Sequence, residues 1–227
     1  MKLYVFLSAL LVGSVSQAAV IGWNFSDDDA VFDTGTPVNF TISPFSIGNT
    51  FGTVADPVNP TSPSTGAGTY PGASGTGNIG NAVNIGALNT ATSAFYSVTF
   101  TPSSGFSIQL ADLDFGTRST GTGPQGYALR SSVDGFATDV LTGTIANNSN
   151  WSFKDNTFGV FTGPLGVAVE FRLYTFGGTG SPTSGTINSR LDDISISVDA
   201  IPEPSAAVAL VGGVGLIGLL RRRTPTA

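Results

Sequence analysis

Short runs in which apolar and polar residues alternate recur along the chain, and they predict β-strands. Side chains two positions apart in such a run lie on one face of a strand. Ile21, Trp23 and Phe25 share a face in this way, and Trp23 is therefore expected in the core. Further runs with this period are followed by turn-forming residues, and they lie at 38–42, 94–101, 106–110, 126–132, 140–145, 167–174 and 194–198.

The composition supports the same fold class. The chain has 30 glycines and 13 prolines, and its glycines lie among threonine, serine and asparagine rather than lysine and glutamate, which helices favour. We predict an all-β domain, a two-sheet sandwich that is jelly-roll-like, with a barrel as the alternative. Residues 46–93 are poor in bulky side chains; there we expect a short strand at 82–88 and a mobile stretch at 57–74.

The first 18 residues have the three-part form of a secretory signal peptide. Lys2 is followed by an apolar stretch, and small residues precede a cleavage point after Ala18, with Ala19 as the second choice. We therefore expect the chain to be exported.

The other end carries an apolar run at 206–220, which begins just after Pro202, Glu203 and Pro204. As a helix with a rise of about 1.5 Å per residue it spans roughly 22 Å, which is shorter than a hydrocarbon core of roughly 30 Å. Snorkelling arginines and local thinning of the bilayer can make up the difference. The arginines that follow favour a cytoplasmic C-terminus; they are Arg221, Arg222 and Arg223.

This ending resembles the PEP-CTERM sorting signal. The likeness covers 201–227: the Pro-Glu-Pro triplet, a short transmembrane helix and a basic tail. It implies that the chain is a substrate of exosortase, a membrane-embedded cysteine transpeptidase of certain Gram-negative bacteria that produce exopolysaccharide. A tail-anchored membrane protein and a buried C-terminal helix are the alternatives.

Charge and residue usage between the two ends exclude several function classes. The chain has neither cysteine nor histidine, so disulfides, a Ser-His-Asp triad and the usual zinc sites are excluded. Residues 19–200 carry five basic and 14 acidic side chains, a net charge near −9. Such a domain repels phosphate backbones, so we expect no nucleic-acid partner.

Two groups of aspartates are candidate calcium ligands, because calcium prefers carboxylate oxygens. Asp27, Asp28 and Asp29, with Asp33 nearby, do not match an EF-hand loop and favour a solvated turn. Asp192 and Asp193 enter the last strand, where alternation would turn one carboxylate to the core side and the other outward. A structural calcium ion or capping of loop amides would both suit that pair.

Sugar binding and glycoside hydrolysis are the remaining chemical options. Trp151 lies in a polar context with Asn148 and Lys154, and is the best candidate for an exposed stacking surface. Hydrolysis needs two carboxylates, but no pair has a recognisable motif. Glu170 neighbours Arg172 on one strand face, which predicts an ion pair there.

Residues 95–198 carry a second resemblance. The runs RSTGTGPQGYALRSSVDGF, EFRLYTFGG and RLDDISISV are similar to the β-rich ectodomains that often precede PEP-CTERM tails. The expected organisation is a signal peptide at 1–18, a sandwich ectodomain at 19–200 and the sorting signal at 201–227. The expected function is that of a non-catalytic envelope or extracellular-matrix protein, held in the inner membrane until it is processed. A carbohydrate-binding module of the exopolysaccharide is the alternative, and a secreted hydrolase the third reading.

Overall fold

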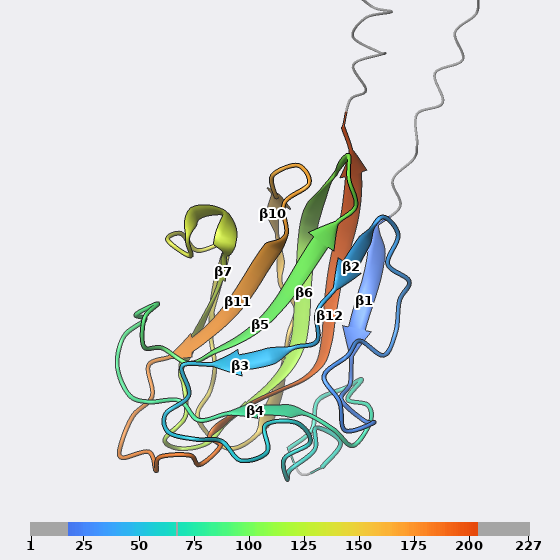
Figure 1. Ribbon diagram of the computed structural model, residues 1–227. Coiled ribbons are helices and arrows are strands. Elements are labelled where there is room, and N and C mark those ends of the chain that lie inside the picture. The colour runs from blue at the N-terminus through green and yellow to red at the C-terminus, as the bar shows by residue number, and fades with distance from the viewer. Residues whose placement is uncertain (1–17, 67, 204–227) are drawn as a thin grey trace, which may run out of the picture. The chain divides into compact units, whose positions relative to one another are not determined.

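Strands lie where the alternation predicts them in the computed structural model, which describes residues 18–66 and 68–203 (Figure 1). The elements of the described chain are β1 (Ala19–Trp23), β2 (Phe40–Ile42), β3 (Ser46–Gly48), β4 (Ile79–Asn81), β5 (Phe95–Pro102), β6 (Phe106–Ser119), β7 (Gly126–Ser131), η1 (Ser132–Asp134), β8 (Leu141–Thr144), β9 (Trp151–Lys154), β10 (Thr157–Thr162), β11 (Val169–Phe176) and β12 (Ser189–Pro202).

The strands form two antiparallel sheets. Sheet A has the order β1-β12-β6-β10, with β4 also paired to β12 and β9 to β6. Sheet B has the order β2-β5-β11-β7-β8, with β3 also paired to β5. The predicted all-β, two-sheet sandwich is therefore confirmed, and the described residues do not form the barrel that was its alternative. The narrower jelly-roll class stays a prediction.

The core lies between the two sheets and consists of the predicted inward faces. Ile21 and Trp23 of β1 are buried there, and so are the apolar positions of β5, β11 and β12. A small apolar cavity of about 20 Å³ lies between the layers and is lined by side chains from both sheets.

Several elements differ from the sequence expectation. β6 and β12 are each 14 residues long and pair with one another, much longer than the predicted strands at 106–110 and 194–198. β9 and β10 were not predicted. The prediction of a strand at 82–88 is wrong. The nearest strand, β4, ends at Asn81, and Ile85 forms only an isolated bridge to Gly178.

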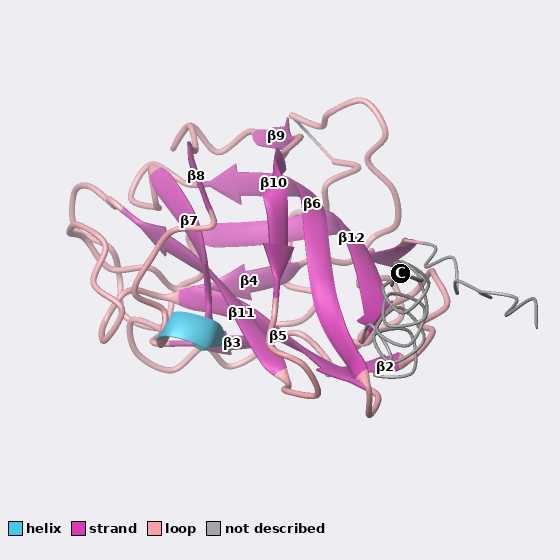
Figure 2. Cartoon of the chain, turned by 90° about the horizontal axis from the view of Figure 1, so that it is seen from above, coloured by secondary structure: helices cyan, strands magenta, loops and turns pink. Residues whose placement is uncertain are grey.

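Helix is limited in the described residues to the three-residue η1 (Figure 2). Within the described part of the chain, no helix is long and apolar enough to cross a membrane. The predicted signal peptide and transmembrane span lie outside the described residues, apart from Ala18.

Candidate functional site

The two consecutive aspartates of β12 lie at an irregularity of the strand. Asp192 is opposite Gly116 of β6, but the next paired residue is Ser195, opposite Asp114, and Asp193 has a left-handed φ of 45°. A bulge of this kind breaks the alternation of side chains. Asp192 is fully buried and Asp193 is partly exposed, and both lie beside the loop that carries Ser64, Tyr70 and Ser74.

Asp193 is the anchor of that loop. Its Oδ2 atom accepts hydrogen bonds from the Ser74 amide at 3.1 Å, the Ser64 hydroxyl at 3.4 Å and the Tyr70 hydroxyl. The Ser74 hydroxyl donates to Oδ1. Of the two roles that the sequence left open for this pair, the structure supports capping of a loop.

Asp192 is fully buried beside this anchor. One carboxylate oxygen accepts a hydrogen bond from the Asp193 amide at 2.7 Å, and the other, Oδ2, has no hydrogen-bond partner. Burial raises the pKa of Asp192 to about 7. The neighbouring Ser64 acts to lower this pKa, although it makes no hydrogen bond of good geometry to Oδ2. The negative charge of Asp193 raises the pKa further.

The described residues contain no group of three or more acidic side chains that could hold a metal ion. The calcium site at Asp192 and Asp193 therefore has two carboxylates at most, and it stays a prediction. The acidic group near the N-terminus bonds to the backbone around it. Asp29 accepts a hydrogen bond from the Val31 amide, and Asp33 accepts one from the Asn24 amide. Asp33 and Asp193 also line one surface pocket of about 200 Å³.

The prediction that Trp151 is exposed for stacking is wrong. Its side chain is only 4% exposed, because the loop anchored by Asp193 covers it. The Trp151 amide donates to the Gly68 carbonyl at 2.9 Å, and the Tyr70 ring lies 6.4 Å from the indole and 5.5 Å from the Phe153 ring. Trp23 is in the core, as predicted.

We expect Asp193→Asn to loosen this loop. Asparagine tolerates the left-handed conformation but has one acceptor oxygen instead of two and no charge, so the free energy of unfolding should fall by about 1–3 kcal/mol. Hydrogen exchange at the Ser74 amide should become faster. Asp155→Asn, at an exposed site, is the matched control. Unchanged exchange at Ser74 would contradict the anchor.

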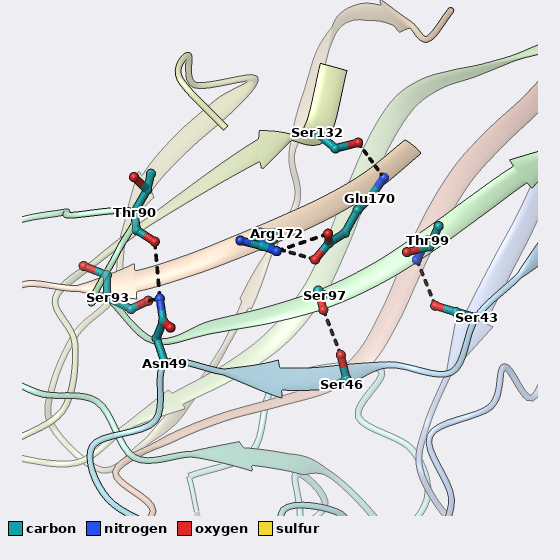
Figure 3. Close-up of polar contacts among 10 residues, drawn as sticks. All are labelled: Ser43, Ser46, Asn49, Thr90, Ser93, Ser97, Thr99, Ser132, Glu170 and Arg172. Carbon is teal, nitrogen blue, oxygen red and sulfur yellow. Dashed lines mark hydrogen bonds and ion pairs between the residues drawn. The ribbon is translucent and has the colours of Figure 1, made fainter. Parts of the chain in front are cut away.

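The outer face of sheet B is polar and is built around Arg172 of β11 (Figure 3). Its Nε and Nη2 atoms donate to the two carboxylate oxygens of Glu170 at 2.7 and 3.2 Å, which confirms the predicted ion pair. The guanidinium also lies over two aromatic rings, 4.4 Å from the centre of Phe95 and 3.9 Å from that of Phe136. Figure 3 shows the hydroxyl contacts beside it, which include Ser46–Ser97 and Ser43–Thr99.

A tightly bonded turn connects β7 to β8 next to this face. Asp134 accepts bonds from the Ala137 and Thr138 amides at 3.1 and 3.0 Å, and the Thr138 hydroxyl also donates to it. The Thr138 hydroxyl is the main cause that lowers the pKa of Asp134, so this carboxylate is ionised at neutral pH. Gly135 and Phe136 both adopt left-handed backbone conformations, with φ of 68° and 63°.

Arg130 secures the other half of the turn. It forms an ion pair with Asp139, Nε to Oδ1 at 2.6 Å, and its Nη1 donates to the Phe136 carbonyl at 3.0 Å. Phe136, in a conformation that bulky residues rarely adopt, is thus fixed between Arg130 and Arg172. The Asp134-Gly135 pair is a turn signal, but nothing in the sequence reveals these long-range partners.

This turn and β10 form the walls of a surface groove of about 510 Å³. We call it the β7–β10 groove. β10 is an edge strand of sheet A, and its Val160 is 62% exposed; from the turn, Val133 is 44% exposed. The lining residues are Ser131, Val133, Asp134, Thr138, Asp139, Val140, Gly159, Val160 and Phe161. The sequence reasoning did not single out any of them as functional residues.

The predicted sorting motif begins inside the folded domain. Pro202 is the last residue of β12 and is paired with Phe106, and the Glu203 amide donates to the Gly105 carbonyl at 2.9 Å. Pro204 and the three terminal arginines lie outside the described residues.

No family model matches this chain, and no curated protein matches it. Among solved structures, the K1 cleaved adhesin domain of Lys-gingipain from Porphyromonas gingivalis W83 is 15% identical, with a TM-score of 0.33 over 78% of this chain and 96% of that one. A structure described as CBM4 is 15% identical, with a TM-score of 0.30 over 54% and 70%. The enzymatically active domain of tailspike protein 4 of bacteriophage CBA120 is 13% identical, with a TM-score of 0.26 over 72% and 20%. Similarities of this size assign no function.

Proposed function

We propose that this chain is an exported, non-catalytic protein of the cell envelope or extracellular matrix, with a jelly-roll-like sandwich as its working domain. One observation carries the proposal: the first strand of the sandwich begins at Ala19, and the last ends at Pro202. These are the positions at which the sequence predicts signal-peptide removal and the start of the sorting motif. Processing at both ends would therefore leave the sandwich whole.

The sorting part of the proposal rests on the PEP-CTERM resemblance. The apolar run and Arg221–Arg223 would hold the precursor in the inner membrane, with the sandwich outside. Exosortase would then process the chain near the Pro-Glu-Pro triplet and release the domain to the surface or the matrix.

Polysaccharide is the partner that the β7–β10 groove supports. Concave sites with apolar walls and a few polar groups are typical of small-ligand binding, and volumes of about 300–1,000 Å³ are usual. The groove falls within that range, and its walls combine valines with hydroxyls and two carboxylates. The carbohydrate-binding function is therefore retained as the second candidate, with this groove in place of Trp151.

The state of the two groove carboxylates favours binding over hydrolysis. A glycosidase needs a general acid whose pKa is raised. The pKa of Asp134 is instead lowered, and Asp139 is in an ion pair with Arg130. Both carboxylates are thus suited to accepting hydrogen bonds.

The mature protein is expected to begin at Ala19, or at Val20 if the second cleavage site is used. Ala19 pairs with Val198 at the start of β1, so cleavage after Ala18 removes no strand residue. N-terminal sequencing of the protein from the medium and from envelope fractions tests this. A mature chain that still begins at Met1 would exclude export through a cleaved signal peptide.

A further inference from the structure

The β7–β10 groove has apolar surface on both walls, and the wall formed by the turn also carries hydrogen-bond acceptors. Val133, Val140, Val160 and Phe161 provide apolar surface, and hydroxyl and carboxylate groups provide acceptors. Pyranose rings present C–H faces and, at their edges, hydroxyl donors. A sugar chain is thus complementary to both kinds of surface at once.

An irregularity in β10 exposes the side chain of Val160 to the groove. The pairing of β10 with β6 shifts between Thr157 and Phe161, and Val160 is exposed at this irregularity. A Cβ atom added to neighbouring Gly159 would meet nothing within 4 Å. The strand therefore leaves open space beside the valine, where a ligand can approach the backbone.

The opposite wall is already rigid without a ligand. Asp134 is tied to Ala137 and Thr138, and Asp139 to Arg130. Because these side chains are fixed, a ligand that bonds to them immobilises little further, which favours affinity.

The charge of the groove restricts its ligand. Among the nine described residues that line it, two are aspartates and none is basic. The nearby guanidinium groups of Arg130 and Arg172 are engaged by Asp139 and Glu170. With a net charge near −9 on residues 19–200, the surface repels polyuronates and sulfated glycans.

We infer that the β7–β10 groove binds a segment of neutral polysaccharide, with sugar hydroxyls donating to Asp134 and Asp139 and a ring face packed on Val133 and Val160. This inference rests on the proposed polysaccharide role and adds the class of polymer. Because the ligand is uncharged, its dissociation constant should change little between about 0.05 and 0.5 M salt, where ionic contacts are progressively screened.

The probes are the neutral and acidic polysaccharide fractions from the medium of cells that make the protein, separated by anion exchange. Calorimetry and affinity electrophoresis with the full processed chain measure binding. Val160→Glu should weaken binding to the neutral fraction by about tenfold or more, because it removes a central apolar contact and adds charge. Val133→Ser, on the opposite wall, should act in the same direction.

Val38→Glu is the matched control, because Val38 is 60% exposed and outside the groove. It should bind as the unsubstituted protein does. Binding of the acidic fraction alone, or equal binding by the Val160 and Val38 variants, would overturn this inference and leave the polysaccharide role standing. Binding of neither fraction would overturn both. Export and processing are measured separately and do not depend on either result.

Discussion

Asp192→Asn is expected to remove most of the pH dependence of the domain's stability between about pH 4 and pH 7. Asp192 is fully buried, and its Oδ2 atom has no hydrogen-bond partner, so its ionised form is poorly solvated. Burial accordingly raises its pKa from 3.8 to about 7. Asparagine has nearly the same shape and remains neutral throughout this range.

The direction of the effect follows from proton binding. Between about pH 4 and pH 7 the folded chain keeps the proton of Asp192 and the unfolded chain has lost it, so stability falls as the pH rises. The full decrease for a pKa that moves from 3.8 to about 7 is about 4 kcal/mol. Burial also raises the pKa of Asp114, which changes stability in the same direction in both proteins.

Urea denaturation at a series of pH values measures this difference. The variant and the unsubstituted protein should be about equally stable below pH 4, and the variant should be more stable above pH 7. Asp56→Asn, at an exposed site, is the control and should follow the unsubstituted protein. Parallel curves for the Asp192 variant would show that this carboxyl does not titrate in the range.

The central strands could be predicted because alternation and burial agree there. In β11, Val169, Phe171 and Leu173 are buried, as their spacing predicts. The pattern fails where partners lie far apart in sequence. β12 was predicted only at 194–198, because the bulge at Asp193 interrupts the period, although the residues from Ser189 to Asp192 pair with β6 in continuous register.

The candidate site was less predictable than the fold. The polar neighbours of Trp151 suggested exposure, but a loop more than 70 residues away in the chain covers it through Gly68 and Tyr70. In β10, Phe158 and Phe161 pack against the core, and Val160 between them is exposed. Strict alternation would place these two phenylalanines on opposite faces of the strand, but the irregular pairing with β6 lets both face the core. The groove brings this strand beside a turn from the other sheet, which no local pattern encodes.

Changing Pro202, Glu203 and Pro204 together to alanine is expected to block processing almost completely and leave the fold intact. Pro202 is the terminal pair of β12, and its side chain is not part of the core, so alanine there should shift the melting temperature little. The apolar run at 206–220 is unchanged, and insertion should therefore be normal. The uncut precursor should accumulate in the inner membrane.

The comparison with the basic tail separates a sorting signal from a plain anchor. Replacing Arg221, Arg222 and Arg223 by glutamine should weaken retention in the membrane, because these charges hold the C-terminus on the cytoplasmic side. The triple-alanine variant should be retained but not cut, so the two variants should differ in where the full-length chain is found. Fractionation and blotting in cells with their exosortase measure both. If the triple-alanine protein reached the medium at the normal rate, the Pro-Glu-Pro triplet would be only a linker between the sandwich and its anchor, and the sorting proposal would be wrong.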